Sequence, residues 1–80
     1  MRIAPSIQVT ATERQQLEQW TRGRRTPARL VLRAKITLLA ADGQDNHHIA
    51  VALDTSRQTV GLWRQRFATQ RLSGLAQDAP

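Results

Sequence analysis

The segment from residue 46 to residue 67 constrains the fold most, because its apolar residues fit two short helices that cross at a fixed angle. Asp45 can cap the first helix, and a small residue, Ala50, stands where the second helix must pass closely. A tight turn at Asp54 and Thr55 separates the two helices. This spacing is typical of a helix-turn-helix, which can place its second helix in the major groove of DNA.

The second helix is predicted to run from Arg57 to about Gln70. Val60, Trp63 and Phe67 recur at spacings of three and four residues, which puts them on one face of that helix. We therefore expect both aromatic residues in the core and not on a platform for stacking bases.

Two residues set the turn. Asp54 stands where glycine is usual in such motifs, so it is expected to adopt a left-handed conformation at a cost of roughly 1 kcal/mol. Ser56 is predicted to cap the second helix by accepting a hydrogen bond from the backbone N–H of Gln58 or Thr59.

The face of the second helix opposite the apolar residues is available for DNA. Arg57 suits guanine and Gln58 suits adenine, while Gly61 permits either a close approach to DNA or a tight helix crossing. The predicted base contacts are Arg57, Gln58, Thr59 and Gly61, and the predicted phosphate contacts are Asn46, His47, Ser56, Arg64, Gln65, Arg66 and Arg71.

The charge of the chain agrees with a nucleic-acid partner. Among 80 residues, 12 are basic and 6 acidic, giving a formal net charge of +6, and all basic residues except Lys35 are arginine. Arginine binds phosphate and guanine with a bidentate fork, although a merely basic protein would have the same balance. Duplex DNA is the predicted partner, with a homodimer possible.

Other chemistries lack the residues that they need. Without cysteine there is no disulfide or thiolate site, which fits a reducing cytoplasm. The adjacent His47 and His48 lack the spacing for shared metal ligation, and Asp45 and Asp54 are explained as cap and turn. We predict no metal, no cofactor, no catalytic residue, no enzymatic activity and no membrane segment.

The rest of the chain also predicts helices, so the fold class is all-α. Residues 1–9 are predicted to form an extended arm, since Pro5 opposes an early helix. A capping box at Thr10 and Glu13 starts a helix that ends at Gly23. The helix-turn-helix domain is predicted over 10–75 and the start of a linker over 76–80. The leucines of the tail at 72–75 are expected to turn back over the core.

A further helix is predicted from a start at Thr26 and Pro27 to a stop at Gly43. It has the longest apolar stripe, and is therefore the expected scaffold of the core. Its predicted buried residues are Leu30, Val31, Ala34, Leu38 and Ala41, and its predicted exposed residues are Arg29, Arg33 and Lys35.

Four stretches together resemble a known family: VTATERQQLEQW, ARLVLRAKITLLAADG, HHIAVALDTSRQTVGLWRQRF and RLSGL. They are similar to the N-terminal region of bacterial insertion-sequence transposases of the mariner superfamily, the IS-six-thirty type. The resemblance implies a homeodomain-like or paired-like domain of four to five helices that recognises the inverted repeats at the ends of the element. In that family a linker and an RNase-H-like catalytic domain follow, and no residue here corresponds to that catalytic domain.

By this resemblance the binding role falls on Arg57, Gln58, Thr59, Gly61, Arg64 and Arg66. Asp54 departs from the usual glycine, and Leu62 stands where a basic residue is common. The implied location is the bacterial cytoplasm, at the nucleoid when the protein is bound.

Two other functions fit the same residues. A stand-alone homodimeric transcription repressor or antitoxin would bind a palindrome with half-sites about 34 Å apart. A protein-interaction module would use Leu62 and Leu72 as exposed apolar anchors and would show no salt-dependent affinity for DNA.

Overall fold

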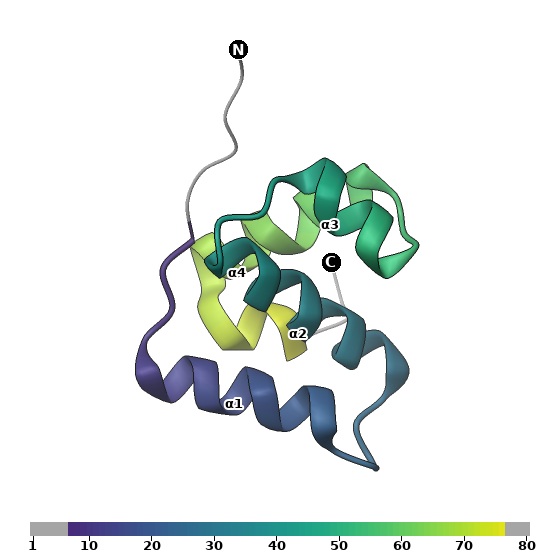
Figure 1. The fold of residues 1–80 in the computed structure, drawn as a ribbon. Helices are drawn as coiled ribbons and strands as arrows, with labels where there is room; N and C mark the ends of the chain where they lie inside the picture. Colours follow the sequence, from purple (N-terminus) through teal and green to yellow (C-terminus); the bar gives the residue numbers. More distant parts are fainter. Residues whose placement is uncertain (1–6, 77–80) are drawn as a thin grey trace.

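The computed structural model describes residues 7–76, which contain four helices joined by short loops (Figure 1). These helices are α1 (Ala11–Arg22), α2 (Ala28–Ala41), α3 (Asn46–Leu53) and α4 (Arg57–Ala76). Residues 7–76 contain no strand, so the all-α prediction is confirmed. The predicted arm is described only from Ile7, and the predicted linker, apart from Ala76, lies outside the described residues.

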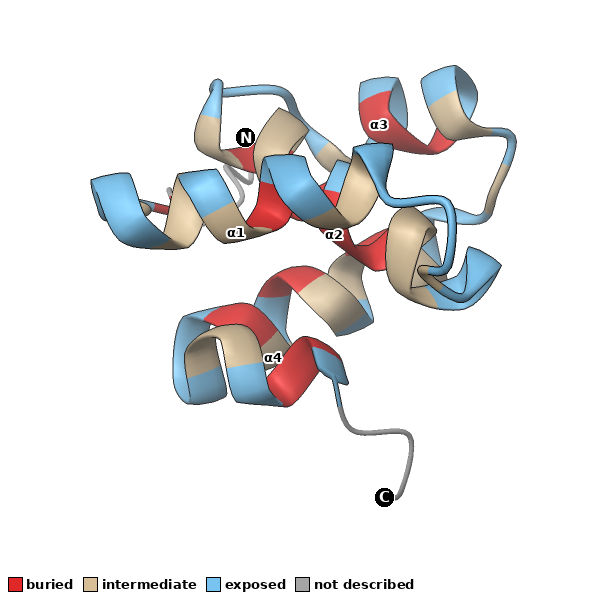
Figure 2. Ribbon diagram, turned by 90° about the horizontal axis from the view of Figure 1, so that it is seen from below, coloured by how far each residue is buried: buried red, intermediate tan, exposed pale blue. Residues whose placement is uncertain are grey.

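Helix α2 is the scaffold, as predicted, because it contacts each of the other three helices (Figure 1). Each helix turns one side toward the interior and another toward solvent (Figure 2). The buried apolar residues form one cluster, to which all four helices and the segment before α1 contribute: Ile7, Leu17, Ala34, Ile36, Ala40, Ile49, Ala50, Val60, Phe67 and Leu75.

The buried face of α2 differs from the predicted stripe. Ala34 is buried as predicted, and Ile36 and Ala40 are buried as well. The other residues predicted to be buried remain partly exposed: Leu30, Val31, Leu38 and Ala41. Three helices pack around α2, so its buried surface is wider than one stripe and is centred elsewhere.

The start of α2 also differs from the prediction. Thr26 does not cap the helix; Pro27 is the N-cap residue, with φ −57° and ψ 143°, and no side chain caps the first turn. Because Pro27 itself has an extended ψ, it cannot be the first residue of the helix, which therefore begins at Ala28. At the other end the predicted stop is confirmed, since Gly43 has φ +93°.

Arg33 is buried, which makes the prediction of an exposed side chain wrong. Its guanidinium carbon lies 3.9 Å from the centre of the Trp63 ring, and its Nη1 donates a 3.0 Å hydrogen bond to the carbonyl oxygen of Leu75. The long arginine side chain can cover apolar surface while its charged end bonds a carbonyl group. Arg33 thus joins α2 to both parts of α4.

Helix α4 is interrupted at Arg71, which has φ 57° and ψ −143°. The chain reverses there and packs Leu75 fully into the core, so the predicted return of the tail is confirmed. A Cβ on Gly74 would lie 2.8 Å from the carbonyl oxygen of Arg66, closer than real Cβ contacts allow. Glycine is therefore required where the returning segment meets α4.

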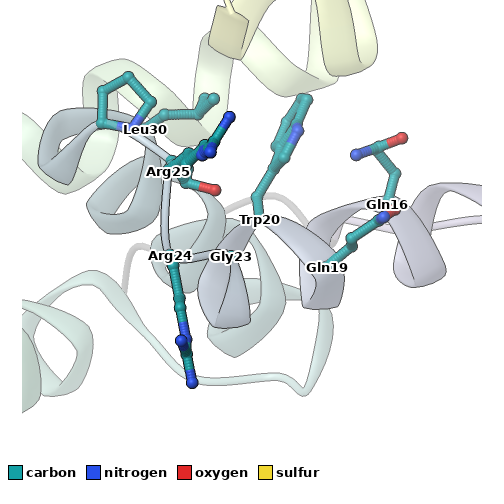
Figure 3. A pocket seen from close by; sticks show the side chains of 9 residues that line it. Gln16, Gln19, Trp20, Gly23, Arg24, Arg25 and Leu30 are labelled. Atoms are coloured by element: carbon teal, nitrogen blue, oxygen red, sulfur yellow. The ribbon is translucent and has the colours of Figure 1, made fainter.

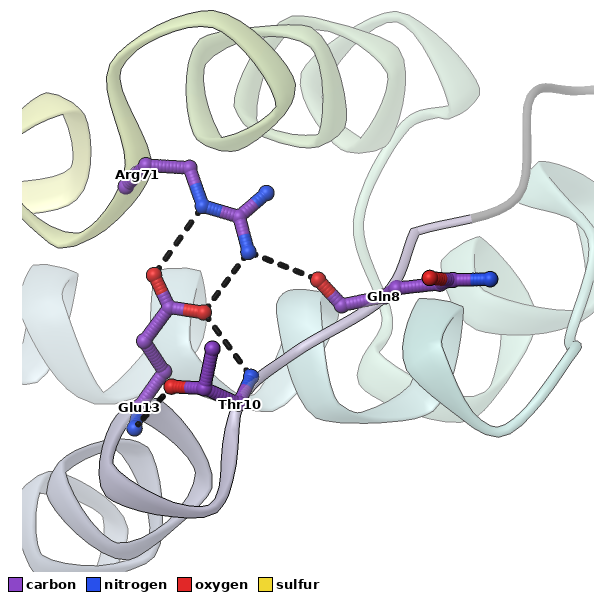
Figure 4. A network of polar contacts seen from close by, with 4 residues as sticks. All are labelled: Gln8, Thr10, Glu13 and Arg71. Carbon is purple, nitrogen blue, oxygen red and sulfur yellow. Dashed lines mark hydrogen bonds and ion pairs between the residues drawn. The ribbon is translucent and has the colours of Figure 1, made fainter.

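Arg71 fastens this reversal to the start of α1 (Figure 4). Its Nε and Nη2 donate to the two carboxylate oxygens of Glu13 at 3.0 and 2.6 Å, and Nη2 also donates to the carbonyl oxygen of Gln8. Glu13 and Thr10 form the predicted capping box, with both hydrogen bonds at 3.0 Å. One carboxylate therefore caps α1 and anchors the end of α4.

The hydrogen bonds from Arg71 and from the backbone of Thr10 hold the pKa of Glu13 below its ordinary value of 4.5. Because the pKa is lower in the folded state, this carboxylate stabilises the fold above pH 4.5 and loses its contribution as pH falls through the lowered pKa. Glu13→Gln should thus lower the free energy of unfolding by about 1 kcal/mol at pH 7 and by almost nothing near pH 2. The effect at pH 7 is small because the Arg71 side chain is 43% exposed, so water screens the ion pair.

Urea unfolding at both pH values measures this difference. Glutamine can still close the capping box, so the substitution removes mainly the charge. Glu18→Gln, at an exposed position of the same helix, is the control and should change stability little at either pH. A Glu13→Gln deficit that is equal at pH 7 and pH 2 would contradict the role of the charge.

Candidate nucleic-acid interface

The turn between α3 and α4 is held by hydrogen bonds at both ends. Asp54 is left-handed, with φ 55° and ψ 51°, as predicted, and the next backbone N–H, of Thr55, donates to the carbonyl oxygen of Ala50 at 2.9 Å. The Ser56 hydroxyl oxygen accepts from the backbone N–H of Thr59 at 3.0 Å, which confirms the predicted cap of α4. These bonds fix the direction in which α4 leaves the turn.

The beginning of α3 is also capped as predicted. The carboxylate of Asp45 accepts from the backbone N–H of His48 at 2.8 Å and lies 2.8 Å from its ring Nδ1. Both contacts lower the pKa of Asp45. His47 is exposed beside it, and the described residues contain no group of three or more side chains suited to a metal ion.

The two helices pack through the residues predicted to lie between them. Ile49, Val60 and Phe67 are fully buried, and Ala50 is 6% exposed. Trp63 is only partly buried; it packs against the edge of the core, and the guanidinium of Arg33 covers its ring. The apolar sides of α3 and α4 therefore form the interior, and the opposite side of α4 is available to a partner.

The exposed side of α4 is a row of four residues, Gln58, Leu62, Gln65 and Thr69, which we call the outer row. Their spacings of four, three and four residues place them on one face, opposite Val60 and Phe67. Leu62 and Thr69 were not among the predicted contacts, although the helical period from Gln58 would have identified them. Arg57 is exposed next to this row, at the first turn of the helix.

Gly61 lies to the side of the outer row, toward α3. A Cβ at this position would be 3.6 Å from Nδ2 of Asn46, which is ordinary van der Waals contact. A side chain would therefore fit at this position, so the crossing of α3 and α4 does not by itself require glycine here.

Two of the predicted phosphate contacts are committed to bonds within the protein. Arg64 is only 6% exposed, and its Nη1 donates to the carbonyl oxygen of Gln44 at 2.9 Å and to Oδ1 of Asn46 at 3.1 Å. Burial lowers the pKa of its guanidinium. Arg71 bonds Glu13 and Gln8, as described above, and its pKa is raised mainly by the hydrogen bond to Glu13.

The remaining predicted contacts are accessible at least in part. Arg66 is half-buried, with its guanidinium carbon 5.5 Å from the centre of the Trp63 ring. Ser56, Gln65 and His47 are exposed, whereas Asn46 and Thr59 are partly buried. The sequence of α4 has four arginines and no acidic residue, so its outer side carries only positive charge.

The model of one protein family, described as a homeodomain-like domain, matches residues 27–76. The chain belongs to this family. The match begins at α2 and ends with α4, so it contains the complete α3–turn–α4 unit. No curated protein and no solved structure matches the chain.

Membership in the homeodomain-like family supports DNA as the partner of this helix-turn-helix domain. No helix within residues 7–76 is both long enough and apolar enough to cross a membrane.

Helix α1 and the loop after it lie outside the part of the homeodomain-like domain that the family model matches. The second half of α1, this loop and the start of α2 surround a cleft lined by Gln16, Gln19, Trp20, Gly23, Arg24, Arg25, Thr26, Pro27 and Leu30. Arg24 and Trp20 point to opposite sides of the loop, whereas Arg25 and Trp20 point to the same side (Figure 3). The two loop arginines therefore do not form one concentrated cationic site.

Proposed function

We propose that this homeodomain-like domain recognises the terminal inverted repeats of a bacterial insertion sequence, as the DNA-binding part of a transposase. The observation that carries the proposal is α4 itself, which presents a polar outer row and arginines on a helix without an acidic residue. The similarity of four sequence stretches to transposase N-terminal regions supports this choice among DNA-binding functions.

In the proposed complex α4 lies in the major groove with its first turns nearest the bases. Arg57 and Gln58 are the leading candidates for base contacts, since both are exposed at the start of the helix. Thr59 and Gly61 are partly buried, so we propose that they contact the DNA only at the edge of this surface. Phosphate contacts are proposed for Ser56, Asn46, His47 and Arg66. Gln65 lies in the outer row, on the side that faces the bases, and Arg64 and Arg71 act mainly within the fold.

Selection of bound duplexes from a random pool tests the proposed target. A transposase domain should select a site without two-fold symmetry, and footprinting should place it within the end of an element that carries the gene. A palindrome with half-sites about 34 Å apart, together with a dimer in light scattering, would instead identify a homodimeric repressor. Affinity that does not respond to salt would argue against binding to DNA altogether.

Arg57→Ala should weaken binding to the selected duplex by roughly 1–3 kcal/mol and relax the preference at one base pair. Titration against selected and random duplexes at two salt concentrations measures both effects. Arg22→Ala removes another exposed arginine, from α1, and is the matched control, expected to keep the preference. Equal losses on selected and random duplexes would remove Arg57 from the base contacts.

A further inference from the structure

Leu62 is an apolar side chain in the middle of the outer row. Its exposed fraction is 47%. Among residues 7–76, the one other large hydrophobic side chain that is exposed is Val51 on α3, at 69%. Gln58 lies one turn before Leu62 and Gln65 one turn after it, both exposed. A leucine at the centre of a polar face can pack against a small apolar group of a partner.

The charges around Leu62 indicate what kind of partner this is. Arg57 and Arg66 lie on the same helix, and α4 has no acidic residue that could repel a polyanion. A shallow hollow lined by Leu62, Gln65, Arg66, Thr69 and Gln70 runs along this side. A small apolar group carried by a polyanion fits these neighbours better than the apolar face of another protein.

In the major groove the exposed apolar group is the C5 methyl of thymine. The 5-methyl group of a methylated cytosine presents the same chemistry. Glutamine can form two hydrogen bonds with adenine, so a leucine between two glutamines suits a run of A·T pairs. The outer row runs from Gln58 to Thr69, which is eleven helical steps and therefore about 16 Å along the helix axis. This length is enough to face several base pairs.

We infer that Leu62 is a specificity-determining residue, which contacts the C5 methyl of a thymine in the DNA site, with Gln58 and Gln65 facing the neighbouring A·T pairs. The inference rests on the proposed function only to the extent that α4 enters the major groove. It does not depend on whether the site belongs to a transposon end or to an operator.

The test deletes the methyl group without changing base pairing. Each thymine of the duplex selected by the wild-type protein is replaced in turn by deoxyuridine. At one thymine the affinity of the wild-type protein should fall about fourfold, the effect of one buried methyl group. Leu62→Ala should bind the original duplex more weakly and should be insensitive to deoxyuridine at that position. Both residues favour helices, so α4 should remain folded, which circular dichroism checks.

Val51→Ala is the matched control, because it shortens an exposed apolar side chain on α3. It should retain the wild-type response to deoxyuridine. A second set of duplexes places cytosine or 5-methylcytosine at the sensitive position; the methylated base should recover about the same fourfold factor if the methyl group alone is read.

Three results on DNA would overturn the inference: a selected site without thymine, a wild-type affinity that no deoxyuridine substitution lowers, or a Leu62→Ala protein that still responds to deoxyuridine. A fourth is that Leu62→Ala abolishes self-association of the protein. The last result would assign Leu62 to a protein contact. If the wild-type protein still prefers the selected duplex over random DNA, none of these four results contradicts the proposed function. A wild-type protein that prefers no duplex over random DNA contradicts the proposed function as well.

Discussion

Phe67→Ala is expected to lower the free energy of unfolding by about 3–5 kcal/mol. Phe67 has no exposed surface, and its ring lies beneath the guanidinium of Arg71, whose carbon is 4.4 Å from the ring centre. Truncation would leave a cavity where α4 packs on the core and would remove the floor of the Arg71 contacts. A domain of this size has about 4–12 kcal/mol of stability, so much of the protein should unfold at physiological temperature.

Urea unfolding followed by circular dichroism measures the loss. Phe67→Leu keeps most of the volume and should cost clearly less than Phe67→Ala. DNA affinity should fall in proportion to the folded fraction, because Phe67 has no exposed atom for a partner. A loss below about 1 kcal/mol would show that Phe67 does not occupy the centre of the core.

Arg64→Ala is expected to destabilise the fold by about 3 kcal/mol, because it removes two hydrogen bonds from a charged, nearly buried group. The carbonyl oxygen of Gln44 and the side chain of Asn46 both lie at the start of α3, so the substitution loosens α3 from α4. The dependence of DNA affinity on salt, corrected for the folded fraction, should remain that of the wild type.

Arg66→Ala is the matched control for Arg64→Ala, since it removes the same side chain from a half-buried position two residues further along α4. It should change stability little and should lower the slope of log K against log salt by about 1, the effect of one phosphate contact. If Arg64→Ala instead leaves the free energy of unfolding unchanged and lowers the slope of log K against log salt, Arg64 is a phosphate contact after all.

The arginines show why the charge of this chain is an incomplete guide to its DNA contacts. Arg33, Arg64 and Arg71 each donate to oxygens of other segments, at Leu75, Gln44 and Glu13 respectively. Their sequence neighbourhoods do not differ visibly from that of Arg66. A basic residue in a sequence does not show whether its nearest acceptor is a phosphate group or a carbonyl oxygen of the same chain, because that acceptor is remote in sequence.

The local features of the fold could be read from the sequence. The caps at Thr10, Asp45 and Ser56 depend on residues three positions away, and all three form as predicted. The left-handed Asp54 likewise follows from its place between two helices. Such features involve residues only a few positions apart, which are necessarily close to one another in the folded chain.

The candidate site was predicted less completely. Its location on α4 and the exposed Arg57 and Gln58 follow from the helical period, and the same period could have identified Leu62. The separation of Arg64 from Arg66 could not be predicted, because it depends on how closely the start of α3 approaches α4.

The sequence alone determined that this protein is helical, where three of its four helices are capped, and that two of them form a helix-turn-helix. Only the tertiary structure decided which arginines bond to other segments of the protein and which face of α2 is buried. Caps and turns depend on neighbours in sequence, whereas burial and long-range hydrogen bonds depend on how four helices approach one another.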